Sequence, residues 1–251
     1  MNRRQPLVAL RALRNLINDP ERTDEVFVIT SSLSGDSIQR GHTRFAATPL
    51  GRNVLDTRRA LLDRLTDRAA LARLPEGSLG RAYLHFVETN NIAADGLVEA
   101  SEAGENDASR KNAYGELNEE QIHYACRLRD MHDLWHVVTG YSTQPFGEVC
   151  VVTFSYPQTG NLGLGVIGLI GALKVARGYP LRAVLSAAWQ AYRNGRRAAW
   201  LPAADWEALL AQPLAAVRAQ LKLTPPTQFQ KLTNYYADWG QSDWDAGAQP
   251  A

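Results

Sequence analysis

Two histidines and two carboxylates lie close together in one part of the chain. His132 and His136 are four residues apart, Asp133 follows the first, and Glu148 comes after eleven further residues. On a helix of about 3.6 residues per turn, the two imidazoles project from one face. Two such imidazoles can bind one divalent ion through bonds of about 2.0–2.1 Å, and a carboxylate from another segment can complete the site. The spacing therefore predicts a metal site in which Glu148 is the third ligand.

Asp133 lies where the metalloprotease motif H-E-x-x-H places its general base. The sequence leaves three roles open for it: a metal ligand, a base, or a group that orients a ligand. A zinc peptidase is the weakest hypothesis, because aspartate replaces the usual glutamate and Glu148 follows early. The pair of histidines is alternatively a coincidence. In a chain of 251 residues with five histidines, a His-x-x-x-His spacing arises by chance about one time in ten.

The segment that carries the histidines has the start and stop signals of a helix. Asn118 precedes an acidic first turn, and Gly140 follows the last apolar residue, which predicts a helix over 119–139. On such a helix His123 falls opposite His132 and is excluded from the metal. Arg129 lies one turn before Asp133, where an ion pair could fix the carboxylate.

Apolar residues recur at helical spacing in most other segments, which predicts an all-α fold. Residues 6–17 form a basic amphipathic helix that packs on the domain or, as the less favoured alternative, lies on anionic lipid. Ser78 is a plausible N-cap for a helix that ends near residue 90. The glycine-rich stretch 161–173 indicates close approach by a neighbouring helix or by a lipid chain. The polar, acidic segment 93–115 is either a cover over the site or an exposed loop.

Composition and charge limit the possible functions. A net charge of +1 argues against a nucleic-acid partner, which needs a concentrated basic surface. Two cysteines and no apolar leader favour the cytoplasm. The longest apolar run, 162–173, is shorter than the roughly 18–20 residues of a membrane span. The basic and aromatic residues of 174–200 suit either a membrane-surface patch or ordinary helix surfaces. We expect one domain over 1–223 and a polar, flexible tail over 224–251.

The pattern His-Asp-x-x-His, eleven residues, then Glu resembles the signature of the coenzyme Q biosynthesis protein 4 family. It is met in full by His132, Asp133, His136 and Glu148. Residues 77–83 resemble the family's glycine-rich helix start, and Asp205-Trp206-Glu207 resembles its C-terminal element, so the likeness covers most of 20–223. The chain departs from mitochondrial members in lacking a targeting leader and in the apolar character of residues 149–156.

This resemblance implies a function in ubiquinone biosynthesis. It implies a single-domain helical bundle with an apolar groove or tunnel for lipid, and it favours the glycine-rich stretch 161–173 as a wall of that channel. It also implies a divalent metal at the four motif positions. Zinc is the first choice, and two histidines with a carboxylate also suit iron. The implied activity is metal-dependent (oxidative) C1-decarboxylation of a polyprenylated 4-hydroxybenzoate-type intermediate, in which Asp133 is the catalytic residue. The alternative is a non-catalytic, prenyl-lipid-binding scaffold that organises other ubiquinone-biosynthesis proteins. The implied partners are a polyprenylated quinone precursor, those proteins and a second copy of the chain. The membrane surface is a further implied partner if the protein is peripheral at the inner face of the cell membrane.

Overall fold

The structure is a computed structural model of the whole chain, and it describes residues 5–18, 23–92 and 117–235. Within these ranges the chain forms helices and no strand, so the predicted all-α class is confirmed. The first half contains α1 (Pro6–Asn18), α2 (Thr23–Ser34), α3 (Ser37–Ala46), α4 (Pro49–Thr57), α5 (Leu62–Thr66), α6 (Arg68–Ala72) and α7 (Leu79–Thr89). The second half contains α10 (Glu119–Asp130), α11 (His132–Thr139), α12 (Pro145–Thr159), α13 (Leu162–Val175), α14 (Leu181–Arg197), the 3₁₀ turn η1 (Leu201–Ala203), α15 (Trp206–Leu209), α16 (Leu214–Gln220) and α17 (Thr227–Tyr235).

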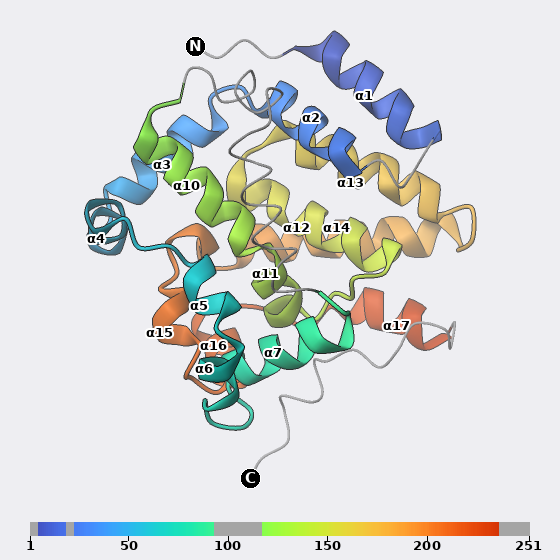
Figure 1. Cartoon of the computed structure of the whole chain (residues 1–251). Coiled ribbons are helices and arrows are strands. Elements are labelled where there is room, and N and C mark those ends of the chain that lie inside the picture. The colour runs from blue at the N-terminus through green and yellow to red at the C-terminus, as the bar shows by residue number, and fades with distance from the viewer. Residues whose placement is uncertain (1–4, 19–22, 93–116, 236–251) are drawn as a thin grey trace.

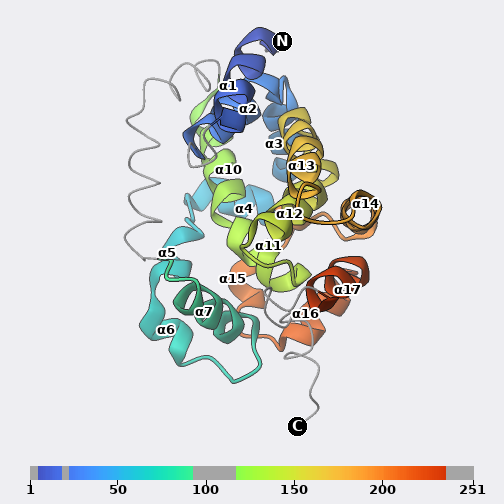
Figure 2. The ribbon, with the colours of Figure 1, turned by 90° about the vertical axis from the view of Figure 1, so that its right-hand side faces the viewer.

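The helix α12 lies at the centre of the molecule. It packs against both α13 and α14, which also contact each other. The helices α1, α2 and α13 form one end of the molecule, and α6, α7 and α16 form the other (Figures 1 and 2). The main hydrophobic core joins α7, α11, α12 and α14 to the short helices α15–α17, and its buried members include Leu79, Phe86, Leu134, Phe154, Trp206 and Phe229.

Several helix ends follow the sequence signals. The Ser78 hydroxyl accepts a hydrogen bond from the Arg81 amide and starts α7, as predicted. The Asn118 side chain caps α10 in a complete capping box with Gln121. Gly140 ends α11 in the left-handed region at φ 74°, where glycine has no steric cost. These local signals therefore fix the helices on which the candidate site depends.

The glycines of α13 serve helix packing. A Cβ on Gly168 would lie 2.5 Å from Thr153 Oγ1 of α12, and one on Gly163 would lie 2.6 Å from the Thr30 Cα of α2. Of the two alternatives for this stretch, close approach by neighbouring helices therefore explains these glycines. The lipid groove or tunnel stays a prediction.

The packed region extends beyond residue 223, the boundary expected from the sequence. Phe229 and Leu232 of α17 are buried in the main core, and α17 packs against α14. Apolar residues are few in α17, so helical periodicity did not reveal it. The rest of the expected tail, 236–251, and the acidic segment 93–115 lie outside the described residues.

The helix α1 packs on the domain. Ala9 and Ala12 are buried with Ile29 and Leu33 of α2, and Leu13 is partly buried against them. Leu7 and Leu10 are instead 80% and 62% exposed. Small residues allow the two helices to approach closely, and these two leucines face outward. None of the described helices is long and apolar enough to cross a bilayer.

Candidate metal centre

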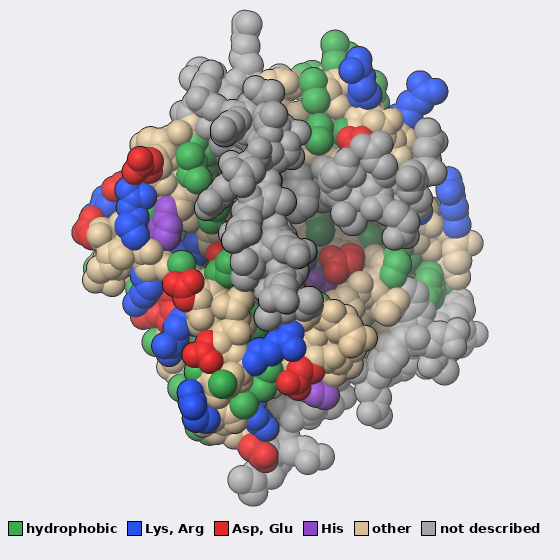
Figure 3. Space-filling view, viewed as in Figure 1, with side chains coloured by type: hydrophobic (Ala, Val, Ile, Leu, Met, Phe, Trp, Pro, Cys, Tyr) green, Lys and Arg blue, Asp and Glu red, His purple; other side chains and the backbone are tan. Residues whose placement is uncertain are grey.

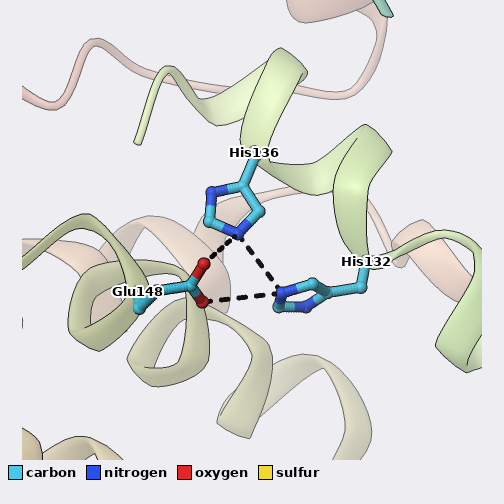
Figure 4. Close-up of side chains that lie close together, drawn as sticks. All are labelled: His132, His136 and Glu148. Atoms are coloured by element: carbon cyan, nitrogen blue, oxygen red, sulfur yellow. Dashed lines mark hydrogen bonds and ion pairs between the residues drawn. The ribbon is translucent and has the colours of Figure 1, made fainter. Parts of the chain in front are cut away.

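Both motif histidines lie on α11. The continuous helix expected over 119–139 is wrong at one point, because the helical path breaks at Met131, whose ψ is −2°, and restarts at His132. No proline or glycine occurs here, so no residue type signalled the break. His132 therefore occupies the first turn of α11, and His136 lies one turn later on the same face (Figure 4).

His136 is held rigidly from two sides. Its Nδ1 lies 2.9 Å from the Tyr141 carbonyl oxygen, so this nitrogen carries the proton and donates. The Phe86 ring of α7 stacks on the imidazole with the centroids 5.7 Å apart. Because Nδ1 is the donor, the Nε2 lone pair faces His132 and Glu148. This is the tautomer that a metal ligand requires.

Glu148 reaches the histidines from the first turn of α12. Its Oε1 lies 3.3 Å from His136 Nε2, and its Oε2 lies 3.7 Å from His132 Nε2. The two Nε2 atoms are 3.2 Å apart (Figure 4). Ligands at about 2.05 Å around a tetrahedral ion are roughly 3.3 Å from one another. The three side chains therefore fit the ligand positions of one divalent ion.

The cluster is closed on one side and open on the other. The His136 side chain is 1% exposed, whereas those of His132 and Glu148 are 40% and 41% exposed. A structural zinc site is fully surrounded by protein ligands, while a catalytic one keeps an open position. The cluster offers three candidate ligands and one accessible side.

Charge couples the three groups. Burial acts to raise the pKa of Glu148, but hydrogen bonds donated by His132 and His136 in their protonated forms outweigh it and lower this pKa to about 2. Burial likewise acts to lower the pKa of His132, and the hydrogen bond and charge of Glu148 raise it above its ordinary value. The carboxylate is therefore ionised and ready to accept a cation at neutral pH.

Asp133 is not brought into this cluster. Among the described residues, the groups that could jointly hold an ion are His132, His136 and Glu148. Asp133 is half-buried in the first turn of α11, and its charge helps to raise the pKa of His132. Its role as fourth ligand or base stays a prediction. Arg129, considered as a partner for Asp133, forms an ion pair at 2.7 Å with Asp130, its neighbour in the chain.

Two supporting groups were missed by sequence reasoning. Arg218 of α16 donates from Nε and Nη2 to the carbonyl oxygens of Val138 and Val137, each at 3.0 Å, and so satisfies the end of α11. Arg127 of α10 forms a two-pronged ion pair with Glu207 at 2.8 and 2.7 Å. Both partners lie about 80 residues away along the chain, so no local pattern could reveal them. His123, expected to face away, stands with Arg59 and Arg127 and outside the cluster.

The surface formed by α4 to α7 carries no single dominant charge. Figure 3 shows basic and acidic side chains interspersed over the part of this face formed by α4 to α7. This mixture accords with the net charge of +1.

A family model described as coenzyme Q (ubiquinone) biosynthesis protein Coq4 matches residues 2–101 and 104–227. The chain belongs to the Coq4 family. The resemblance drawn from the histidine motif is thereby confirmed, and with it a function in ubiquinone biosynthesis.

Individual family members support the same assignment. The mitochondrial ubiquinone biosynthesis protein COQ4 homologue of Mus musculus is 30% identical over 223 residues, covering 88% of this chain and 78% of the mouse protein. The Homo sapiens homologue is 29% identical and covers 90% of this chain and 81% of the human protein. A crystal structure from Nostoc punctiforme has the same fold, with a TM-score of 0.59 at 21% identity, covering 86% of this chain and 97% of the other.

Proposed function

We propose that this protein is a metal-dependent enzyme of ubiquinone biosynthesis. Its reaction is (oxidative) decarboxylation at C1 of a polyprenylated 4-hydroxybenzoate-type intermediate. The observation that carries the proposal is the convergence of His132, His136 and Glu148 on one point that is accessible from outside. Membership of the Coq4 family supports the pathway.

The three side chains would hold a divalent metal, with zinc the first choice and iron the second. When bound, such an ion supplies a Lewis acid that binds the carboxylate or phenolate oxygen of the ring. His136 fixes the position of the cluster, because its Nδ1 is committed to Tyr141. The exposed edges of His132 and Glu148 mark the side from which the ring enters. Asp133 would act as the fourth ligand or as a base.

A surface for the lipid part of the substrate is proposed on α13 and α14. These two helices contact each other, and they leave five large apolar side chains exposed: Leu169, Leu173, Leu181, Leu185 and Trp189. The exposed basic residues Lys174, Arg177 and Arg182 belong to the same part of the chain. Apolar side chains bordered by basic ones suit an anionic membrane surface, from which a prenylated precursor could be taken.

The enzymatic proposal is tested with purified protein and a short-chain prenyl hydroxybenzoate. We expect metal to be present in proportion to protein, and carbon dioxide release to stop in Glu148→Gln and His132→Gln. His85→Gln is the matched control, because His85 is exposed on α7 and lies outside the cluster. Running the reaction with and without dioxygen decides whether the step is oxidative. Undiminished turnover by metal-free protein would reject the proposal.

The membrane contact is tested by flotation with vesicles of anionic or neutral lipid. The double variant Leu169→Gln/Leu173→Gln should lose binding to anionic vesicles. Ile122→Gln is the control, because this residue is also an exposed apolar side chain but lies on α10. Equal binding by the double variant and the control would remove α13 from the proposal.

The second candidate is a non-catalytic scaffold that binds a prenylated intermediate and organises partner enzymes. The exposed apolar face of α13 and α14 favours it, because such faces also bind proteins. The metal would then be structural. On this hypothesis His136→Ala lowers the melting temperature and the amount of co-purifying prenyl lipid together, and the wild-type protein turns over no substrate.

A further inference from the structure

A second site lies at the other end of α12. A cavity of about 360 Å³ opens where the last turn of α12 meets the ends of α3 and α14 and the residue before η1. Its lining includes Arg44, Tyr156, Gln158, Tyr192, Arg196 and Trp200. Glu148 and Gln158 are ten residues apart on α12, which corresponds to roughly 15 Å along the helix axis. The cavity is therefore separate from the metal cluster.

The floor of the cavity is fully hydrogen-bonded. The buried Gln158 amide donates to the Gly195 carbonyl oxygen at 2.6 Å and accepts from the Leu201 amide at 2.8 Å. The Trp200 indole donates to the Gln158 carbonyl oxygen at 2.8 Å. A Cβ on Gly195 would collide with the Phe154 carbonyl oxygen, so α14 is held directly against α12. A ligand would therefore find a rigid floor with few unpaired neutral polar groups.

Two guanidinium groups remain available at the rim. Arg44 lies over the Trp200 ring, 4.0 Å from its centroid, and Arg196 lies 6.0 Å from the Tyr192 centroid. Among the described residues, no carboxylate forms an ion pair with either arginine. A guanidinium matches a carboxylate with two parallel hydrogen bonds, and a ring beneath it limits its motion. The rim is thus prepared for a negatively charged group.

The walls are aromatic. The Tyr156 and Tyr192 rings stack at 6.2 Å with 27° between their planes, and Trp200 closes another side. Flat apolar walls favour a flat apolar ligand body. A nucleotide fits less well, because the polar edge of its base would find few partners on the saturated floor.

We propose that this cavity binds a small aryl carboxylate, whose ring lies against Tyr156 and Tyr192 and whose carboxylate is held by Arg44 and Arg196. The volume is at the lower end of the roughly 300–1,000 Å³ of small-molecule sites, which suits one or two fused rings. The site is remote from the metal cluster, so the inference does not depend on the proposed decarboxylation.

Titration calorimetry with 2-naphthoate tests the inference on the full chain. Saturable binding should weaken at least tenfold in Arg44→Gln and in Arg196→Gln. Arg197→Gln is the matched control, because Arg197 is the next residue of α14, is exposed and does not line the cavity. Arg44→Lys keeps the charge without the two-pronged geometry and should bind with intermediate affinity. Melting curves establish that each variant is folded, as expected for exposed positions.

The choice of probes distinguishes binding in this cavity from binding at the metal cluster. Binding should persist after chelation of metal and in His132→Gln, whereas a carboxylate bound at the metal cluster would be lost in both. 2-Naphthylmethanol, which has the ring without the charge, and inorganic phosphate, which has the charge without the ring, should each bind at least tenfold more weakly. Phosphate as tight as naphthoate, equal losses in Arg196→Gln and Arg197→Gln, or no binding at millimolar concentration would each overturn the inference.

Discussion

The helix pair α10 and α11 carries two groups of charged side chains that differ in how completely they are paired. Arg127 and Glu207 are 2% and 9% exposed and share two short hydrogen bonds. The cluster on α11 has longer contacts, from 3.2 to 3.7 Å, and two of its three members are about 40% exposed. A closed pair has little left to bind, whereas an open cluster retains lone pairs for a ligand. We therefore expect the first group to stabilise the fold and the second to bind metal.

The largest effect is expected from Arg127→Met. This change leaves the buried Glu207 with Arg59, at 3.2 Å, as its remaining partner, so we expect a loss near the lower end of the about 3–5 kcal/mol found when a buried pair is broken. Denaturant titration of metal-free protein measures it. Arg193→Met on the exposed surface of α14 is the control and should change stability by less than about 0.5 kcal/mol. A loss equal to that of the control would mean that the buried pair is not a stabilising element.

The reverse pattern is expected from His132→Gln. Metal affinity should fall about 100-fold or more, because even the loss of a group that supports a ligand costs about 10–100-fold. The unfolding free energy of metal-free protein should stay within about 1 kcal/mol, since this side chain is partly exposed. Competition with a chelating dye measures affinity, and His85→Gln is the control. A large loss of stability with unchanged metal affinity would mean that His132 stabilises the fold and does not bind metal.

Arg218→Met should lower both the unfolding free energy and the metal affinity, each by less than in the more strongly affected of the two variants above. It leaves the carbonyl oxygens of Val137 and Val138 without these donors, at a cost of about 1–3 kcal/mol. Because those carbonyls end the helix that carries His136, metal affinity should also fall, by less than for His132→Gln. The same two assays detect the change. Unaltered affinity in a destabilised protein would limit Arg218 to a structural role.

The smallest effect is the pH dependence of the closed pair. Burial acts to raise the pKa of Glu207, but the hydrogen bond and charge of Arg127 lower it below the ordinary value of 4.5. A lowered pKa in the folded state gives stability that is complete above about pH 4.5 and lost as the pH falls through the folded value. Wild-type protein should therefore lose more stability than Glu207→Gln between pH 5 and 3. If the unfolding free energies of the two proteins fell in parallel over this pH range, Glu207 would not be the source of the pH dependence.

Local signals in the sequence predicted the frame of the site. The caps at Ser78 and Asn118 and the glycine after Thr139 each depend on neighbouring residues, so their physics can be read from a short stretch. The convergence of Glu148 on the two histidines was also anticipated, because the interval after Gly140 is long enough for the chain to turn back over the histidine face.

The remaining features depend on contacts between distant segments. The support from Arg218 and the burial of Phe229 arise only when α11, α16 and α17 are packed together. The glycines of α13 had two physical explanations, and the neighbouring Thr30 and Thr153 distinguished them. Helical periodicity and capping signals therefore predict the helices, but they do not predict which distant segments pack together.

The interruption at Met131 makes α11 a separate unit of eight residues that carries both imidazoles. A tilt or rotation of α10 about this joint would leave the spacing between His132 and His136 unchanged. The distance between the two nitrogen ligands is therefore set within α11 and does not depend on the direction of α10.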